Sequence, residues 1–146
     1  MIRRARQADL APLISLAVAW TERYPHLRMD KDKIREGIRI GIVQPTTHFC
    51  AVSHEEGQAP TGMLLAHQGP NPWAKKNFAN VVFWASQIPG DGARMLRTFK
   101  QWVDSRSVVR VAGFLPDLEV DPRALALAER IGFAKHGGAR LYYKGT

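Results

Sequence analysis

The spacing of apolar residues near the start of the chain predicts a short strand followed by an amphipathic helix. Residues 2–5 have the composition of an edge strand, and Asp9 is placed to cap the helix that follows. The helix should end near Tyr24 and Pro25, because proline interrupts helical hydrogen bonding. Its apolar stripe is formed by Leu10, Leu13, Ile14, Ala17, Val18 and Trp20.

A second helical pattern follows directly. Isoleucines at 34, 38 and 42 are spaced four apart, which places them on one helical face. We expect this helix to begin at Asp30 or Asp32 and to end before Pro45. Gly37 and Gly41 on the same helix indicate close packing against a neighbouring element.

The rest of the chain alternates between strand and helix patterns. Runs of β-branched and aromatic residues predict strands, and two of these runs, 48–52 and 62–66, are joined by a polar segment typical of a hairpin turn. Apolar residues at helical spacing predict two further helices, over 93–103 and from Pro122 to Ile131. The remaining predicted strands are 80–85, 108–114, 133–136 and 140–144, the last two forming a closing hairpin.

The turn between strand 80–85 and helix 93–103 is the strongest candidate for chemistry. It has the spacing Gln87-x-x-Gly90-x-Gly92, and glycines in such a turn adopt backbone angles closed to other residues. The unpaired N–H groups at a helix start can then bind an anion such as a phosphate. The turn lacks the further glycine of a dinucleotide fingerprint and the Gly-Lys-Ser/Thr ending of a nucleotide P-loop. The alternative is a tight turn that binds nothing.

Length and composition predict a single domain over residues 1–146. The chain is 45% hydrophobic, which is ordinary for a globular protein. It has no apolar run of the ~20 residues needed to cross a bilayer, and its first residues lack the apolar core of a signal peptide. We therefore expect a cytoplasmic protein with no membrane partner. Cys50 is the only cysteine, so we expect no internal disulfide and no cysteine-based zinc site. We also expect no metal cofactor.

The charge balance is strongly basic. The chain has 21 basic and 13 acidic residues, a formal net charge of +8. Such a surface favours association with polyanions, including nucleic acid, but does not choose among them. The basic residues are also dispersed along the chain rather than gathered in one tail, which is equally typical of a solvated basic surface.

The glycine turn and the order of elements together resemble the GNAT (Gcn5-related N-acetyltransferase) superfamily. The turn matches its acyl-CoA signature, Gln or Arg, two residues, Gly, one residue, then Gly or Ala. A second resemblance lies at the family's Ala-x-x-Leu-Tyr-x-x-x-Gly-Phe helix end, where Ala124, Leu127, Gly132 and Phe133 are kept. The resemblance implies an α/β GNAT-like acyl-CoA N-acyltransferase fold, with a mixed central sheet of about seven strands flanked by four helices.

The resemblance also implies an activity, transfer of an acetyl group from acetyl-CoA to a primary amine by direct attack. Backbone N–H groups of the glycine turn would hold the pyrophosphate, and a splay between the fourth and fifth strands would admit the pantetheine. Backbone N–H groups near Trp84 and Ala85 would polarise the thioester carbonyl. The implied acetyl-CoA site comprises Trp84, Ala85, Gln87, Ile88, Gly90, Asp91, Gly92, Ala93 and Arg94.

Three positions depart from the family pattern, and one of them, Asp121 in place of a common asparagine, is explained by helix capping. Ala128 stands where the family commonly has a tyrosine that protonates the leaving thiolate, and alanine has no proton to give. Asp91 lies inside the glycine turn, where a carboxylate repels a pyrophosphate unless it points away. Arg94 and Arg97 are placed to compensate that charge.

Four residues are candidates for the catalytic acid and base. Tyr142 and Tyr143 are the candidate acids, since alternation along a strand lets one pack inward while the other faces the site. His67 and Glu119 are the candidate bases. The alternative is that His67 is an ordinary surface histidine and Glu119 a solvated loop residue.

Two other functions remain open at this point. The chain is also compatible with a GNAT-like binding domain without catalysis, because fold does not fix function. The basic charge permits an acetyltransferase whose amine is carried by a nucleic acid. The acceptor is otherwise a small molecule or a protein amine, and a homodimer is compatible with the sequence.

Overall fold

The computed structural model describes residues 1–22, 29–70, 72–73, 75–106, 109–114 and 122–133. The elements alternate much as the apolar spacing predicts, and their bounds follow in chain order. They are β1 (Ile2–Arg4), a short 3-10 helix (Gln7–Asp9), α1 (Leu10–Thr21), α2 (Lys31–Val43), β2 (His48–Ser53), β3 (Gly62–Gly69), β4 (Asn77–Ser86), α3 (Asp91–Asp104), β5 (Val109–Phe114) and α4 (Pro122–Ile131).

The described strands form one sheet in the order β1-β2-β3-β4-β5. The first four are antiparallel to their neighbours, and β5 runs parallel to β4. The sheet is therefore mixed, and four α-helices accompany it, as expected. The expectation of about seven strands is not met, since the described residues form five. The last two predicted strands, 133–136 and 140–144, fall almost entirely on residues outside the described part.

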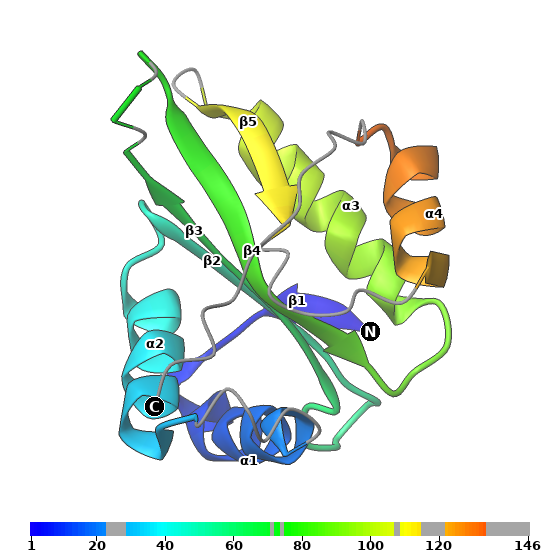
Figure 1. Ribbon diagram of the computed structural model, residues 1–146. Helices are drawn as coiled ribbons and strands as arrows, with labels where there is room; N and C mark the ends of the chain where they lie inside the picture. The colour runs from blue at the N-terminus through cyan, green and yellow to red at the C-terminus, as the bar shows by residue number, and fades with distance from the viewer. Residues whose placement is uncertain (23–28, 71, 74, 107–108, 115–121, 134–146) are drawn as a thin grey trace.

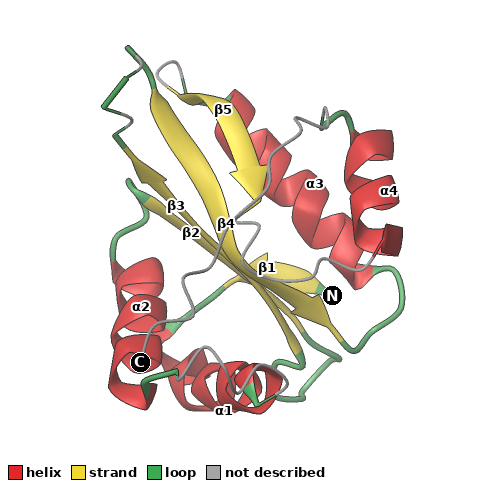
Figure 2. Ribbon diagram, viewed as in Figure 1, coloured by secondary structure: helices red, strands yellow, loops and turns green. Residues whose placement is uncertain are grey.

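The sheet separates two pairs of helices (Figures 1 and 2). α1 and α2 cover one face, where the buried residues include Leu13, Ile38 and Phe83. α3 and α4 cover the other face, where Met95 and Phe99 are buried against the strands. Successive side chains along a strand point to opposite faces of a sheet, so each strand contributes side chains to both helical layers. Both faces of the central strands are thus buried.

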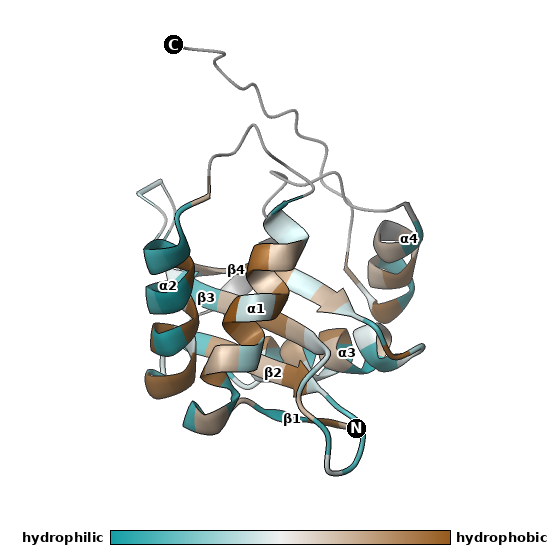
Figure 3. Ribbon diagram, turned by 90° about the horizontal axis from the view of Figure 1, so that it is seen from below, coloured by the Kyte–Doolittle hydropathy of each residue, from teal (hydrophilic) through white to brown (hydrophobic). Residues whose placement is uncertain are grey.

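α2 shows how local sequence sets a helix. Asp30 caps it, accepting hydrogen bonds from the N–H groups of Asp32 and Lys33. The helix turns its hydrophobic residues toward the sheet and its hydrophilic residues outward (Figure 3). The expected close packing is confirmed at Gly41, where a Cβ would collide with the Leu65 side chain. It is wrong at Gly37, where a Cβ would meet nothing within 4 Å.

The predicted cap of the first helix is also wrong. Asp9 precedes α1 but makes no side-chain capping bond to it. Its buried carboxylate instead accepts two hydrogen bonds from the Arg3 guanidinium, at 2.7 and 2.9 Å, and one from the Arg6 N–H at 2.7 Å. The physical reason is that a buried carboxylate binds the strongest donor within reach, and here a guanidinium lies across the sheet edge.

β4 contains a bulge at Val82. Its pairing with β3 jumps from Val81 opposite Ala66 to Phe83 opposite Leu65, so that Val82 has no partner. In consequence Val82 and Phe83 both pack on the α1 and α2 face, although they are adjacent in sequence. Bulges increase the local twist of a strand. The second half of β4 is therefore rotated relative to its first half.

The described pairs of β4 with β5 end next to the bulge, at Phe114, the last described residue of β5. The last pair is Val81 with Phe114, and among the described strands Phe83–Ser86 pair with β3 alone. One edge of β4 is thus left without a strand partner in the part of the chain that the structure describes. Within the same part, no helix is long and apolar enough to cross a membrane.

Candidate functional site

The glycine turn joins the end of β4 to the start of α3. Gly90 is the N-terminal cap residue of α3 and has φ +83°, ψ −20°. This is the left-handed region, which favours glycine. The N–H of Asp91 bonds to the Ile88 carbonyl and that of Arg94 to the Gly90 carbonyl. The N–H groups of Gly92 and Ala93 make no hydrogen bond to any described residue, so both remain available to an anion.

The space around the two glycines fits an anion. A Cβ at Gly90 would meet no atom of the described residues within 4 Å, so the described part of the chain leaves the turn open on that side. A Cβ at Gly92 would lie 3.6 Å from the Trp84 indole, and the indole N–H donates to the Gly92 carbonyl at 3.0 Å. Trp84 therefore holds the turn from the sheet side without filling the open side. The residues present can accommodate the phosphate end of an acyl-CoA.

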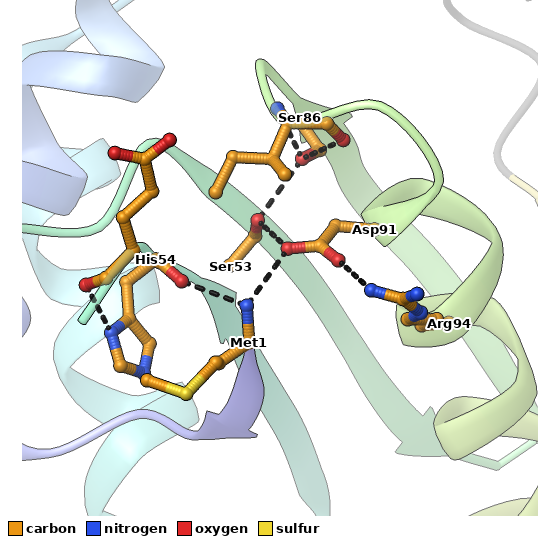
Figure 4. A network of polar contacts seen from close by, with 8 residues as sticks. Met1, Ser53, His54, Ser86, Asp91 and Arg94 are labelled. Atoms are coloured by element: carbon orange, nitrogen blue, oxygen red, sulfur yellow. Dashed lines mark hydrogen bonds and ion pairs between the residues drawn. The ribbon is translucent and has the colours of Figure 1, made fainter.

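Asp91 points away from this open side. Its side chain is 0% exposed, and Figure 4 shows the carboxylate directed toward β2 and β1. Oδ2 accepts from Ser53 Oγ at 2.7 Å and lies 3.3 Å from the nitrogen of Met1, while Oδ1 accepts from Arg94 at 3.0 Å. The Ser53 hydrogen bond is the main reason that the pKa of Asp91 lies below its usual value, and burial opposes it. The predicted repulsion of an anion is thus relieved by geometry.

Two serines that the sequence did not single out complete this contact. Ser86, the last residue of β4, accepts the Ile88 N–H at 3.1 Å, and its Oγ lies 3.1 Å from Ser53 Oγ (Figure 4). Ser53 and Ser86 lie on strands that are not adjacent, with Gly62 of β3 between them. No local signal could have found this group, because it depends on the register of three strands.

The other residues predicted around the turn vary in exposure. Gln87 is exposed, and its N–H donates to the Thr61 carbonyl at 3.2 Å. Arg94 has a side chain that is 66% exposed beside the helix start. Ile88 is half-buried, and Ala85 packs toward the α1 and α2 face. The predicted acetyl-CoA residues thus lie at the turn and at the end of β4.

His67 lies on β3, beside the last described pairs of β4 with β5. It pairs with His48 on β2 and with Asn80 on β4, one residue before the last β4–β5 pair. Partners in register share one face, so the three side chains form a row on the α1 and α2 face. The two imidazole centroids are 6.1 Å apart, and His67 Nδ1 is buried without a hydrogen-bond partner among the described atoms. Burial lowers the pKa of His48, and the neighbouring His67 adds to this effect.

Of the other residues considered for chemistry, three lie outside the described part of the chain and two are buried packing residues. Glu119, Tyr142 and Tyr143 lie outside the described residues. Ala128 is 3% exposed on α4, packed in the core beneath the sheet, so this position offers no proton donor. Cys50 is buried, and burial raises the pKa of its thiol to about 12, so it is a packing residue. The described ranges hold no cluster of three or more His, Cys, Asp or Glu side chains that could bind a metal ion.

Comparison with known proteins rests on structure. No protein-family model matches the sequence, and no curated protein matches it. Solved structures do match over the whole chain. A possible acetyltransferase from Clostridium difficile 630 is 13% identical, with a TM-score of 0.72, covering 100% of this chain and 97% of that one. The protein has the fold of the GNAT acetyltransferases.

Two further matches show the range of proteins with this acetyltransferase fold. One is an aminoglycoside acetyltransferase from an uncultured soil metagenomic sample, in complex with sisomicin, with 18% identity and a TM-score of 0.70, covering 100% of this chain and 96% of that one. The other is a transcriptional regulator from Bacillus halodurans C-125, with 18% identity and a TM-score of 0.71, covering 98% and 99%. At these identities the likeness establishes the fold.

Proposed function

We propose that the protein is an N-acetyltransferase that uses acetyl-CoA as donor and a primary amine as acceptor. The observation that carries the proposal is the pair of available N–H groups at Gly92 and Ala93, beside the open space at Gly90. The fold supports the proposal, because this chain shares it with solved structures described as a possible acetyltransferase and an aminoglycoside acetyltransferase. Acetyl-CoA supplies an activated acyl group, a thioester carbonyl that a neutral amine can attack.

Residues at the end of β4 and at the start of α3 would each contact a different part of acetyl-CoA. The Gly92 and Ala93 N–H groups bind the pyrophosphate, with the positive end of the α3 dipole behind them and Arg94 at the side. Among the described strands Phe83–Ser86 pair with β3, and an extended arm would lie along the opposite edge of this segment. Backbone N–H groups near Trp84 and Ala85 polarise the carbonyl as it gains negative charge. Positioning then provides much of the rate.

His67 is the described residue best placed to take the proton of the amine. A general base must reach the reacting group, and His67 is partly exposed, although its Nδ1 is buried. Since Asn80 pairs with both Gly113 and His67, the histidine lies level with the last described pairs of β4 and β5. Ala128 offers no proton for the thiolate, so this proton comes from solvent or from Tyr142 or Tyr143.

Calorimetry on two glycine variants tests the donor site. Gly90 (φ +83°) and Gly57 (φ +70°) share a left-handed backbone, and a Cβ would meet nothing within 4 Å at either. Gly90→Val and Gly57→Val should therefore cost similar stability, about 1–2 kcal/mol. Only Gly90→Val should weaken acetyl-CoA binding, by tenfold or more. Equal affinity in Gly90→Val and the unchanged protein would remove the turn from the site.

A second candidate is a binding domain that keeps the fold without catalysis. One observation favours it, that a transcriptional regulator shares this fold at a TM-score of 0.71. The net charge of +8 would serve such a role through contact with a nucleic acid. The two candidates differ in how ligand binding depends on salt.

A further inference from the structure

A closed ring of hydrogen bonds lies beneath the glycine turn (Figure 4). The Ile88 N–H donates to Ser86 Oγ, which lies 3.1 Å from Ser53 Oγ, and Ser53 donates to the Asp91 carboxylate. Ile88 and Asp91 belong to the same turn, so the chain of bonds returns to the backbone from which it started. The ring therefore fixes the two ends of the segment that contains Pro89 and Gly90.

The direction of the bonds in this ring is set by chemistry. An ionised carboxylate only accepts, so the single proton of Ser53 goes to Asp91. Ser53 is then free to accept the proton of Ser86, and Ser86 accepts from the Ile88 N–H. A second acceptor for Ser86, the Ile88 carbonyl, is more distant at 3.3 Å. Each bond in such a chain polarises the next, which strengthens the set as a whole.

Gly62 allows the ring to form. It lies on β3 between Ser53 and Ser86, and a Cβ there would come within 2.9 Å of the Ser53 Cβ and 2.8 Å of the Ser86 Cα. Two serines on strands that flank a third can bond to each other only if the middle residue has no side chain. Ser53, Gly62 and Ser86 lie on three neighbouring strands. Together they allow the hydrogen bonds that reach the Asp91 carboxylate on α3.

We infer that Asp91 is a positioning residue, which presets the glycine turn in its anion-binding shape before acetyl-CoA arrives. The inference rests on the proposed function. Asp91 stands between Gly90 and Gly92, so anchoring its side chain also fixes the direction of the two N–H groups that follow. A turn that is already ordered loses less conformational freedom on binding, and this raises affinity.

A purely repulsive role and a positioning role for Asp91 predict opposite changes in anion affinity when its charge is removed. If its negative charge were only a nearby repulsion, Asp91→Asn would make the turn more positive and tighten the binding of an anion. If Asp91 is a positioning residue, the same variant loses the charged acceptor that orders the ring, and binding weakens. Arg94 already balances part of the charge at 3.0 Å, which reduces the repulsive term. The sign of the change separates the two accounts.

The first test uses two buried aspartates as a matched pair. Asp9 and Asp91 are 5% and 0% exposed, and each bonds to an arginine. Asp91→Asn should weaken acetyl-CoA binding about tenfold in calorimetry and accelerate amide hydrogen exchange at 88–93 in the free protein by tenfold or more. Asp9→Asn also removes a buried charge, but it should leave the affinity and the exchange at 88–93 unchanged.

The second test is milder and leaves the carboxylate in place. Ser86→Ala removes the middle link of the ring and should accelerate the same exchange, whereas Ser86→Thr keeps the hydroxyl and should restore protection and affinity. Tighter binding by Asp91→Asn, or unchanged exchange in Ser86→Ala, would overturn the inference. A failure of the unmodified protein to bind acetyl-CoA, with the exchange changes still present, would instead overturn the proposed function, because exchange is measured without ligand.

Discussion

At the scale of single residues, two buried carboxylates each fix the backbone at the start of a helix. Asp9 holds the entry to α1 through Arg3, and Asp91 holds the glycine turn through Ser53. A buried charge is tolerated only when it is paired and hydrogen-bonded, and both aspartates meet that condition. Their hydrogen bonds favour the ionised form and hold both pKa values below the usual range for aspartate. Both residues therefore link stability to pH.

The acid limb of the stability profile tests this linkage. A folded-state pKa below the unfolded value of about 3.9 adds stability that is complete above about pH 5. This stability is lost as pH falls through the folded pKa. Urea unfolding between about pH 5 and pH 2 should therefore show a shallower loss of stability in Asp91→Asn than in the unchanged protein.

Asp104→Asn is the control for that experiment. Asp104 also lies on α3, but its side chain is 62% exposed and pairs with Lys100 at the surface, where ion pairs contribute little. Its acid limb should follow that of the unchanged protein. If all three proteins lose stability in parallel, Asp91 does not hold a preferentially ionised state in the fold.

The role of His67 is tested by turnover once an acceptor is known. His67→Ala should lower turnover by about 10²-fold, the usual size of a general base contribution. His54→Ala is the control, because His54 is also partly exposed and its imidazole bonds to the Glu55 carbonyl in the β2–β3 loop. Equal turnover in both variants would leave the proton to solvent or to Glu119.

At the scale of elements, the predictable features are those with local causes. α2 was predicted from its isoleucine spacing, Asp30 as a cap and Pro45 as a stop, and all three act within a few residues. α4 likewise ends before Gly132, which has φ +110°. The glycine turn was predicted as the link between β4 and α3, because its spacing and its flanking patterns agreed.

The features that sequence did not predict arise from contacts between strands. The bulge at Val82 depends on pairing with β3, and the row of His48, His67 and Asn80 depends on the register of three strands. The direction of Asp91 depends on Ser53, which lies 38 residues earlier in the chain. Apolar spacing specifies which face of a strand is buried, but it does not specify which residue stands opposite.

The two glycines of α2 provide a test of packing between elements. Gly37→Ala should stabilise the protein by roughly 0.5–1 kcal/mol, because alanine favours helix and its Cβ meets nothing. Gly41→Ala gains the same propensity but pushes the buried Leu65 side chain, and overpacking of this kind typically costs about 1–3 kcal/mol. It should therefore destabilise the protein in urea unfolding. Equal stabilisation by both variants would show that Leu65 moves aside freely.

At the scale of the whole molecule, the excess of positive charge serves either candidate function. A CoA site built on backbone N–H groups uses few side-chain charges, whereas nucleic-acid binding recruits many lysines and arginines. Lys31, Lys33 and Lys75 are exposed and lie away from the glycine turn, and Lys76 directly follows Lys75 in the chain. That the chain forms a single domain over residues 1–146 stays a prediction.

Salt separates the two modes of binding. Affinity for a duplex falls with salt at a log–log slope of about −0.9 for each phosphate contacted, while binding at backbone N–H groups falls much less. Acetyl-CoA binding should survive at a salt concentration that abolishes duplex binding. Replacing Lys31, Lys33, Lys75 and Lys76 by glutamine should reduce only the duplex affinity. A parallel fall of both affinities would show that the two ligands share the same charges.

The most direct test of acetyl transfer is a mass-resolved screen. The protein is incubated with acetyl-CoA and, separately, with small amines, proteins and oligonucleotides, and each product is examined for the mass of one added acetyl group. The account predicts that at least one amine gains an acetyl group with the unchanged protein and with Gly57→Val, and that the gain falls tenfold or more with Gly90→Val. A salt-resistant, sequence-selective complex with an oligonucleotide, no affinity for acetyl-CoA and no acetylated product would contradict it.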